Sequence, residues 1–122
     1  MTTGTKQLGN RGEETAAVYL SNSGHEVLAR NVRTPYGELD LITRQAGSIV
    51  FVEVKTRRSR THGLPEEAVT SRKRNHLLAS AQYYLQRHAS SDFPWRIDVV
   101  AVEFDSSGTL TRLEVFENAV HA

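Results

Sequence analysis

Two neighbouring stretches decide the fold, GELDLI at residues 37–42 and IVFVEVK at residues 49–55. Both are rich in Leu, Ile and Val, and Gln45–Gly47 between them is typical of a turn. They predict an antiparallel hairpin with strands at Leu39–Thr43 and Ser48–Thr56. Apolar residues occupy both faces of the second strand, which indicates a central strand covered on both sides.

The segments around this hairpin predict two helices and three further strands. Apolar residues recur at helical spacing from about Asn10 to Ser21 and again from about Ser71 to His88. The further strands are predicted at Glu26–Arg33, Trp95–Phe104 and Leu110–Phe116, and Glu117–Ala122 is predicted to be a fraying tail. The order αβββαββ predicts an α/β fold, a mixed β-sheet flanked by helices, in a single domain over residues 1–122.

The composition excludes several classes of protein. The 122 residues include no cysteine, which excludes disulfide frameworks, zinc ribbons, iron-sulfur sites and thiolate nucleophiles. No run approaches the roughly 20 apolar residues of a membrane-spanning helix, and the first residues lack the apolar region of a signal peptide. We therefore expect a soluble, cytoplasmic protein with no membrane partner.

The charge is polarised along the chain although the net charge is only +1. From Lys55 to Arg74, seven basic residues face two glutamates, a net +5, whereas from Asp92 to the end six acids face two arginines, a net −4. A basic face of this kind favours a polyanionic partner, although a solvated loop is the simpler alternative. The loop residues expected to bind nucleic acid are Arg57, Arg58 and Arg60.

Four polar residues are predicted to meet at one edge of the sheet. Glu53 and Lys55 share one face of their strand about 7 Å apart, and Asp40 lies on the adjacent strand, within about 5 Å of its cross-strand neighbour. Glu13 heads the apolar stripe of the first helix and therefore points toward the sheet. Two alternatives stay open: a same-face salt bridge between Glu53 and Lys55, and a capping box in which Glu13 reaches back to Asn10.

The charge of this cluster favours a bound divalent cation. Glu13, Asp40 and Glu53 contribute three negative charges and Lys55 one positive charge, which leaves −2. Two carboxylates about 4 Å apart repel by roughly 4 kcal/mol at an effective dielectric constant of 20, so without a cation one tends to protonate. Oxygen ligands and the absence of cysteine favour Mg²⁺ or Mn²⁺ over zinc.

The second helix provides a separate indication of an anionic ligand. If it begins near Ser71, its first turn holds Arg72, Lys73 and Arg74, where the helix dipole disfavours cations by about 0.3 to 1 kcal/mol each. Bound phosphate compensates for that cost, because helix N-termini and basic side chains favour the same anion. Alternatively, the helix begins at Pro65 and the cations are ordinary mid-helix charges.

Asp98 and two aromatic residues are weaker candidates. Asp98 lies in an apolar strand, where it is either a further metal ligand or a structural acceptor and ion-pair partner. Tyr36 and Trp95 have rings that can stack on bases, and packing is the simpler role for Trp95.

Taken together, these residues resemble those of a known superfamily, the restriction-endonuclease-like or PD-(D/E)XK nucleases, in the arrangement of archaeal Holliday junction resolvases. Leu39 stands where that pattern has proline, at a variable position. More narrowly, nearly the whole chain resembles the bacterial YraN-like family. The segments that carry this resemblance are Gly9–Glu13, Tyr19–Leu20, Arg30–Asn31, Gly37–Ile42, Val50–Arg57, Ala68–Thr70 with Lys73, and Arg96–Val100.

The resemblance implies a restriction-endonuclease-like fold and a set of site residues. Asp40, Glu53 and the Val54 carbonyl are expected to bind Mg²⁺ or Mn²⁺, Lys55 to orient or activate water, and Glu13 to hold a water or a second ion. Catalysis of this kind depends on positioning and electrostatics. The residues expected to grip nucleic acid are Arg57, Arg58, Arg60, Lys73 and Arg74.

Three functions are hypotheses at this point. The first is a metal-dependent endonuclease acting on structured or branched DNA in repair or recombination. The second is a nucleic-acid-binding module on a nuclease fold without turnover. The third is a protein-interaction adaptor that docks through the acidic segment from Asp92 onward. Resolvase-like relatives commonly dimerise, so a homodimer is an open alternative.

Overall fold

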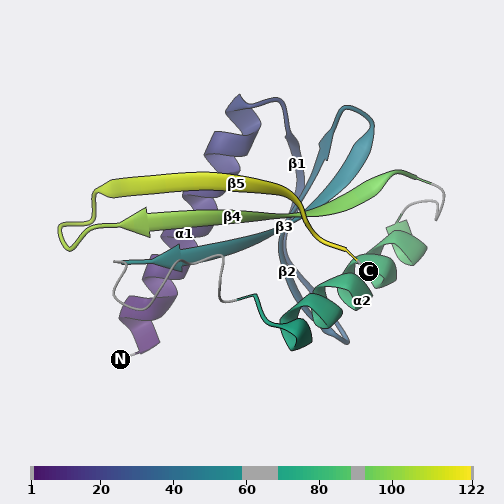
Figure 1. Ribbon diagram of the computed structural model, residues 1–122, viewed down its shortest axis with the longest axis horizontal. Helices are drawn as coiled ribbons and strands as arrows, with labels where there is room; N and C mark the ends of the chain where they lie inside the picture. The colour runs from purple at the N-terminus through teal and green to yellow at the C-terminus, as the bar shows by residue number, and fades with distance from the viewer. Residues whose placement is uncertain (1, 59–68, 89–92, 122) are drawn as a thin grey trace.

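Two helices lie on opposite faces of one five-stranded sheet (Figure 1). The computed structural model describes residues 2–58, 69–88 and 93–121. The predicted order αβββαββ and the α/β fold are confirmed. No helix within these residues is long and apolar enough to cross a membrane. The elements are α1 (Thr2–Asn22), β1 (Glu26–Thr34), β2 (Gly37–Gln45), β3 (Ser48–Arg57), α2 (Ser71–His88), β4 (Trp95–Phe104) and β5 (Leu110–Val120).

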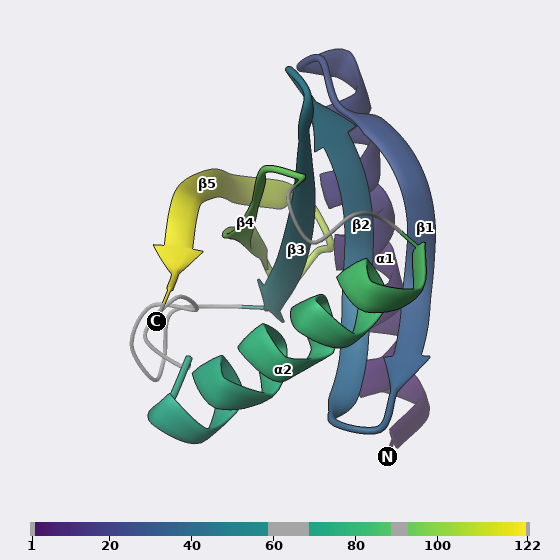
Figure 2. The same cartoon turned by 90° about the vertical axis from the view of Figure 1, so that its right-hand side faces the viewer.

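The strands follow the sheet order β1-β2-β3-β4-β5, so β3 is central. Only the β3–β4 pair is parallel; the other neighbours are antiparallel. In Figure 2, α2 passes the end of β3 and crosses in front of β2, while α1 runs behind the same sheet. Val50, Phe51 and Val52 are buried on alternating faces, as predicted for a strand covered on both sides.

Each helix covers its own apolar layer. On one face, Ala16, Ala17 and Leu20 of α1 pack against valines of β3 and β4. On the other face, Leu77 and Ala81 of α2 belong to the layer that includes Phe51 of β3. Alternation along β3 therefore places Glu53 and Lys55 on the α2 face, beyond the apolar part of the strand.

Two predicted boundaries are wrong. Helix α1 begins at Thr2 rather than near Asn10, because Leu8 packs against the core and offsets the weak helix propensity of Gly9. The predicted fraying tail is instead the end of β5, where Val120 is buried in the α2-side layer. Burial of that one side chain explains the extra strand, since apolar contact fixes a segment that is otherwise polar.

Gly12 lies at a close approach between α1 and β3. A Cβ atom at this position would lie 2.0 Å from Thr56 Oγ1 and 2.9 Å from Thr56 Cβ. Only a residue without a side chain lets the helix backbone approach the strand this closely. Glu13 follows Gly12 on α1 and Lys55 precedes Thr56 on β3, so two predicted site residues are chain neighbours of this contact.

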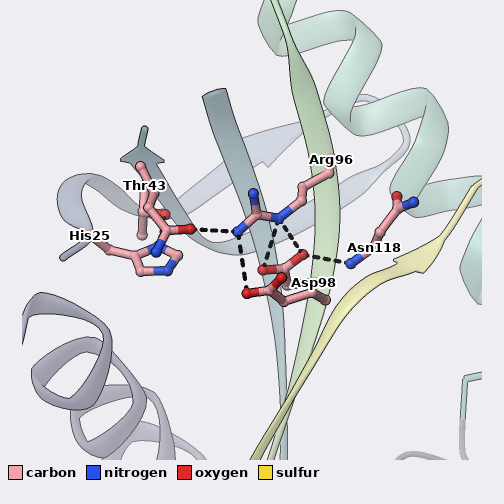
Figure 3. A network of polar contacts seen from close by, with 7 residues as sticks. His25, Thr43, Arg96, Asp98 and Asn118 are labelled. Atoms are coloured by element: carbon pink, nitrogen blue, oxygen red, sulfur yellow. Dashed lines mark hydrogen bonds and ion pairs between the residues drawn. The ribbon is translucent and has the colours of Figure 1, made fainter. Parts of the chain in front are cut away.

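Asp98 is a structural acceptor and ion-pair partner (Figure 3). Its carboxylate accepts hydrogen bonds from Arg96 Nε at 2.9 and 3.2 Å and from the Asn118 backbone N–H at 2.8 Å. Arg96 also donates to Gln45 Oε1 at 2.7 Å. Asn118 has a left-handed φ of 51°, so the carboxylate fixes an irregular turn of β5 against β4. This resolves the two alternatives for Asp98 in favour of the structural role.

Asp98→Asn is expected to lower the free energy of unfolding by about 2 kcal/mol. The amide keeps one acceptor but loses the charge that compensates Arg96, and its NH₂ group faces another donor. Urea denaturation measures the change. Glu117→Gln is the control, because Glu117 is exposed and lies 4.0 Å from the same arginine, so its loss should cost less than about 0.5 kcal/mol. Equal losses in the two variants would contradict the structural role of Asp98.

Candidate functional site

The candidate site lies where β2 and β3 separate. Their pairing ends at Leu41 and Val52, whereas β3 continues alongside β4 as far as Arg57. The Val54 N–H donates instead to Asp40 Oδ2 at 2.9 Å. The carboxylate of Asp40 thus occupies the place of the missing strand partner and is held beside the next part of β3.

Glu53 is buried with one oxygen satisfied and one not. Only 3% of the residue is exposed. Its Oε2 lies 3.5 Å from Lys55 Nζ and 3.4 Å from Lys73 Nζ. Its Oε1 is buried without a hydrogen-bond partner among the residues that the structure describes. A buried acceptor of this kind is costly, so the site favours a proton or a cation at Oε1.

Protonation of Asp40 can supply the proton that the buried Glu53 carboxylate favours. Burial, and next the charge of Glu53, raise the pKa of Asp40 to about 8, while the hydrogen bond from Val54 N–H acts in the opposite direction. Near neutral pH the metal-free site therefore keeps a proton on this pair of carboxyls. A divalent cation can stabilise the same two groups in their charged form.

Glu13 lies within electrostatic range of this pair, on the middle of α1. Its pKa is raised by burial, then by the charges of Glu38 and Glu53, and is lowered by a side-chain hydrogen bond with Asn31. The charge of Glu13 in turn raises the pKa of Asp40. Because α1 begins at Thr2, the capping-box alternative for Glu13 is wrong.

Asn31 is a site residue to which the sequence assigned no role. It has a φ of 52° in the middle of β1, between the pairs Arg30–Leu41 and Val32–Leu39. Asparagine is among the residues that tolerate this left-handed backbone. The irregularity places Asn31 opposite Asp40 and allows its side chain to reach Glu13. A single sequence offers no signal for such a mid-strand turn beyond the residue type itself.

The structure brings the predicted carboxylates near one another, but they do not form a complete set of metal ligands. Asp40 and Glu53 interact directly, and Glu13 acts on Asp40 through its charge. Within residues 2–58, 69–88 and 93–121, no three His, Cys, Asp or Glu side chains are close enough together to hold a metal. Lys73 also changes the charge balance: three carboxylates and two lysines leave −1, not the −2 expected without Lys73.

A basic cavity adjoins the carboxylates on the α2 side. It has a volume of about 360 Å³ and is lined by Lys55, Thr70, Arg72, Lys73 and His76. Thr70 caps α2: its Oγ1 accepts from the Lys73 N–H at 3.2 Å and its carbonyl from the Arg74 N–H at 2.8 Å. Helix α2 therefore begins at Ser71, as predicted, and the alternative start at Pro65 is wrong.

The remaining basic residues are distributed differently from the sequence expectation. Arg74 lines a separate cavity of about 340 Å³ with Val99 and Phe116, on the β5 side of α2. Arg57 and Arg58 lie at the end of β3, where Arg58 is exposed, and Arg60 lies outside the described residues. Arg72, one of the first-turn cations for which bound phosphate was expected to compensate, lines the basic cavity, and His76 takes a place there that the sequence did not assign to it. Their position depends on the rotation of α2 about its axis, which its apolar stripe fixes only approximately.

The profile of an uncharacterised protein family, UPF0102, matches residues 12–102. The chain belongs to the UPF0102 family. The match spans Glu13, Asp40, Glu53, Lys55 and Lys73, and it confirms the resemblance to the bacterial YraN-like family.

Similar UPF0102 proteins occur in several bacteria. One from Symbiobacterium thermophilum is 48% identical over 118 residues, which cover 97% of this chain and 99% of that protein. One from Dehalococcoides mccartyi is 44% identical over 115 residues, covering 94% and 93%. One from Roseiflexus castenholzii is 48% identical over 103 residues, covering 84% and 83%. This UPF0102 chain therefore corresponds to most of the length of each of these relatives.

Proposed function

We propose that this UPF0102 protein is a Mg²⁺- or Mn²⁺-dependent endonuclease that hydrolyses phosphodiester bonds of structured or branched DNA, in repair or recombination. The observation that carries the proposal is the buried carboxylate of Glu53, which interacts with Asp40 and whose Oε1 has no hydrogen-bond partner within the described residues, next to a cavity lined by Lys55 and Lys73. Resemblance to PD-(D/E)XK nucleases and to archaeal Holliday junction resolvases supports the same assignment.

The donor atoms at this place suit a hard divalent cation. Asp40 and Glu53 offer carboxylate oxygens, and the Val54 carbonyl is a third oxygen ligand in the proposal. Mg²⁺ is commonly bound through one or two carboxylates together with waters and substrate phosphates, so a third carboxylate is not required. A cation held there supplies Lewis-acid polarisation of the scissile phosphate. In the proposal Glu13, whose side chain is hydrogen-bonded to Asn31, holds a water beside the carboxylates.

Basic residues of the chain bind the phosphate in this proposal. Lys55 is about one-quarter exposed and lines the basic cavity while remaining 3.5 Å from Glu53, so it can orient the attacking water and offset charge that develops on the phosphoryl oxygens. Lys73, Arg72 and the N-terminus of α2 hold the adjoining phosphate. Positioning and electrostatics then provide the rate acceleration without a covalent nucleophile.

Cleavage assays test the proposal with duplex, single-stranded and four-way-junction DNA, each with Mg²⁺ or Mn²⁺. The wild type should cut the branched substrate, and Lys55→Ala should lower the rate about 100-fold, as expected for the loss of one transition-state contact. Arg44→Ala is the control, because Arg44 is an exposed cation at the far end of β2, paired with Glu26, and should leave the rate unchanged. No metal-dependent cleavage of any substrate, or equal rates in wild type and Lys55→Ala, would contradict the proposed site.

A second candidate function is binding of nucleic acid without turnover. The raised pKa of Asp40 favours it, because a shared proton makes the carboxyl pair stable near neutral pH without a metal. Salt-sensitive DNA binding that is independent of Mg²⁺ and Mn²⁺, with no cleavage in either metal, would favour this second function. The adaptor hypothesis has less support, since Asp98 and Glu103 of the acidic segment are buried rather than on a docking surface.

A further inference from the structure

We infer that one side of α2, together with the β1–β2 turn, binds an unpaired nucleic-acid strand that leaves the carboxylate site. We call this surface the α2 flank and define it as Lys73, His76, Tyr83 and Arg87, with Tyr36 from the turn. The inference rests on the proposed function, because the flank begins at the proposed nuclease site, and it names the unpaired strand as the substrate feature.

The α2 flank follows one side of the helix, with the buried Ser80 between its two halves. Lys73, His76, Ser80, Tyr83 and Arg87 are spaced by 3, 4, 3 and 4 residues, which places them on one side of an α-helix. The stripe extends for about 21 Å at a rise of 1.5 Å per residue. Leu77 and Ala81 beside it are buried against the sheet, whereas Arg74 and Leu78 line cavities on the other side, against β5.

Side-chain contacts connect the flank to the proposed site at one end and to the β1–β2 turn farther along. Lys73 lies 3.4 Å from Glu53, and it lines the basic cavity together with His76. One turn farther along, Ser80 Oγ lies 2.8 Å from Thr34 Oγ1, which anchors the helix beside the β1–β2 turn. Figure 2 shows α2 crossing from the end of β3 over β2 toward β1. A strand that leaves the basic cavity along α2 therefore meets the turn next.

Two tyrosines and an arginine meet at that turn. The rings of Tyr36 and Tyr83 are 6.3 Å apart at 73°, and Arg87 Cζ lies 4.4 Å from the centre of the Tyr83 ring. Tyr36 is 51% exposed. The Thr34–Ser80 hydrogen bond already fastens the turn to the helix, so packing alone does not account for a half-exposed ring at this place. A half-exposed ring held against a second ring can serve as a stacking platform for a base.

The charge of α2 fits the same partner. The helix carries Arg72, Lys73, Arg74 and Arg87 and contains no Asp or Glu. Cations interleaved with aromatic rings are the usual surface for single strands, whose phosphates and base faces are both accessible. A duplex buries its base faces, so stacking on Tyr36 selects the unpaired strand. The chemistry is shared by DNA and RNA, and the experiment therefore includes both.

Fluorescence anisotropy tests the inference with the full chain in EDTA, so that no metal-dependent cleavage can occur. The probes are a 12-nucleotide single-stranded DNA, the same sequence as RNA, and a blunt 12-base-pair DNA duplex. Tyr36→Ala should weaken binding of the single strands about tenfold and binding of the duplex less than twofold. Tyr36→Phe should bind as the wild type does, because it keeps the ring. Arg87→Gln should weaken single-strand binding and reduce its salt dependence.

Tyr19→Ala is the matched control, because Tyr19 is a similarly exposed tyrosine on α1, across the sheet from the α2 flank. It should leave all three affinities unchanged. The inference is overturned if the wild type does not bind the single strands or if Tyr36→Ala leaves their affinity unchanged. It is also overturned if Tyr36→Ala weakens binding of the duplex as much as binding of the single strands. Single-strand binding is measured in EDTA, whereas cleavage requires the metal. Loss of strand binding with cleavage intact, or loss of cleavage with strand binding intact, therefore distinguishes failure of this inference from failure of the proposed function. Unequal affinities for the two single strands would identify DNA or RNA as the preferred source.

Discussion

Asp40→Asn should abolish metal-dependent cleavage and at the same time stabilise the metal-free protein. The amide oxygen can still accept the Val54 N–H, and the NH₂ group can donate to the carboxylate of Glu53. It therefore removes the repulsion between two buried carboxyls. Because the charged ligand is lost, we expect cleavage to fall at least about 1,000-fold, comparable to the removal of other essential electrostatic groups.

The gain in stability should depend on pH in one direction. The pKa of Asp40 is raised from about 4 in the unfolded chain to about 8 in the fold, so the contribution of this carboxyl to stability is fully present below about pH 4 and is lost as pH rises toward 8. The Asp40→Asn variant has no ionisable group at this position and should not lose stability in this way as pH rises. Its melting temperature should exceed that of the wild type by about 4 °C or more at pH 8 in EDTA and by little at pH 4.

Two controls make this result specific. Asp40→Ala removes the acceptor for the Val54 N–H as well as the charge, so it should lower the melting temperature. Mn²⁺ should raise the melting temperature of the wild type but not that of either variant, because only the wild type has the charged carboxylate pair. If Asp40→Asn destabilises the metal-free protein as much as Asp40→Ala does, then Asp40 and Glu53 are not a repelling pair.

The fold was predictable because its signals are local. Strand β3 has apolar residues on both faces until Glu53, and that pattern alone indicates a central strand with a polar end. The end of β5 was not predictable in the same way. Glu117–Asn118 is polar and Asn118 has a left-handed backbone, and only the burial of Val120 and the bond to Asp98 make the segment a strand. Such long-range contacts leave no periodic pattern in the sequence.

The site was predictable in its residue types but not in its balance of charge. Alternation along β3 places Glu53 and Lys55 together, and hairpin geometry brings Asp40 to them. Lys73 reaches the same oxygen of Glu53 from a helix whose rotation depends on how Leu77 packs. The charge of the cluster is therefore −1 rather than the expected −2, and a metal is not required by charge alone. The stronger indication is the buried Oε1 of Glu53, which lacks a hydrogen-bond partner in the part of the chain that the structure describes and which no sequence pattern encodes.

Gly12→Ala should destabilise the protein by about 3 kcal/mol, although alanine usually stabilises a helix. The added Cβ would lie 2.0 Å from Thr56 Oγ1 and 2.8 Å from Thr56 Cγ2, so α1 or β3 must move. Gly9→Ala is the control in the same helix, since nothing lies within 4 Å of its Cβ, and it should stabilise by about 0.5 to 1 kcal/mol. Urea denaturation of both variants measures these opposite signs.

Thr56 provides the second half of the experiment and connects packing with function. Thr56→Ala removes the two nearest atoms but leaves Cβ at 2.9 Å, so the double variant with Gly12→Ala should recover only part of the lost stability. Glu13 follows Gly12 and Lys55 precedes Thr56, so separation of α1 from β3 moves a carboxylate away from the site. Cleavage by Gly12→Ala should therefore fall at temperatures where the protein is still folded. Full activity in folded Gly12→Ala would mean that Glu13 does not act with Asp40 and Glu53.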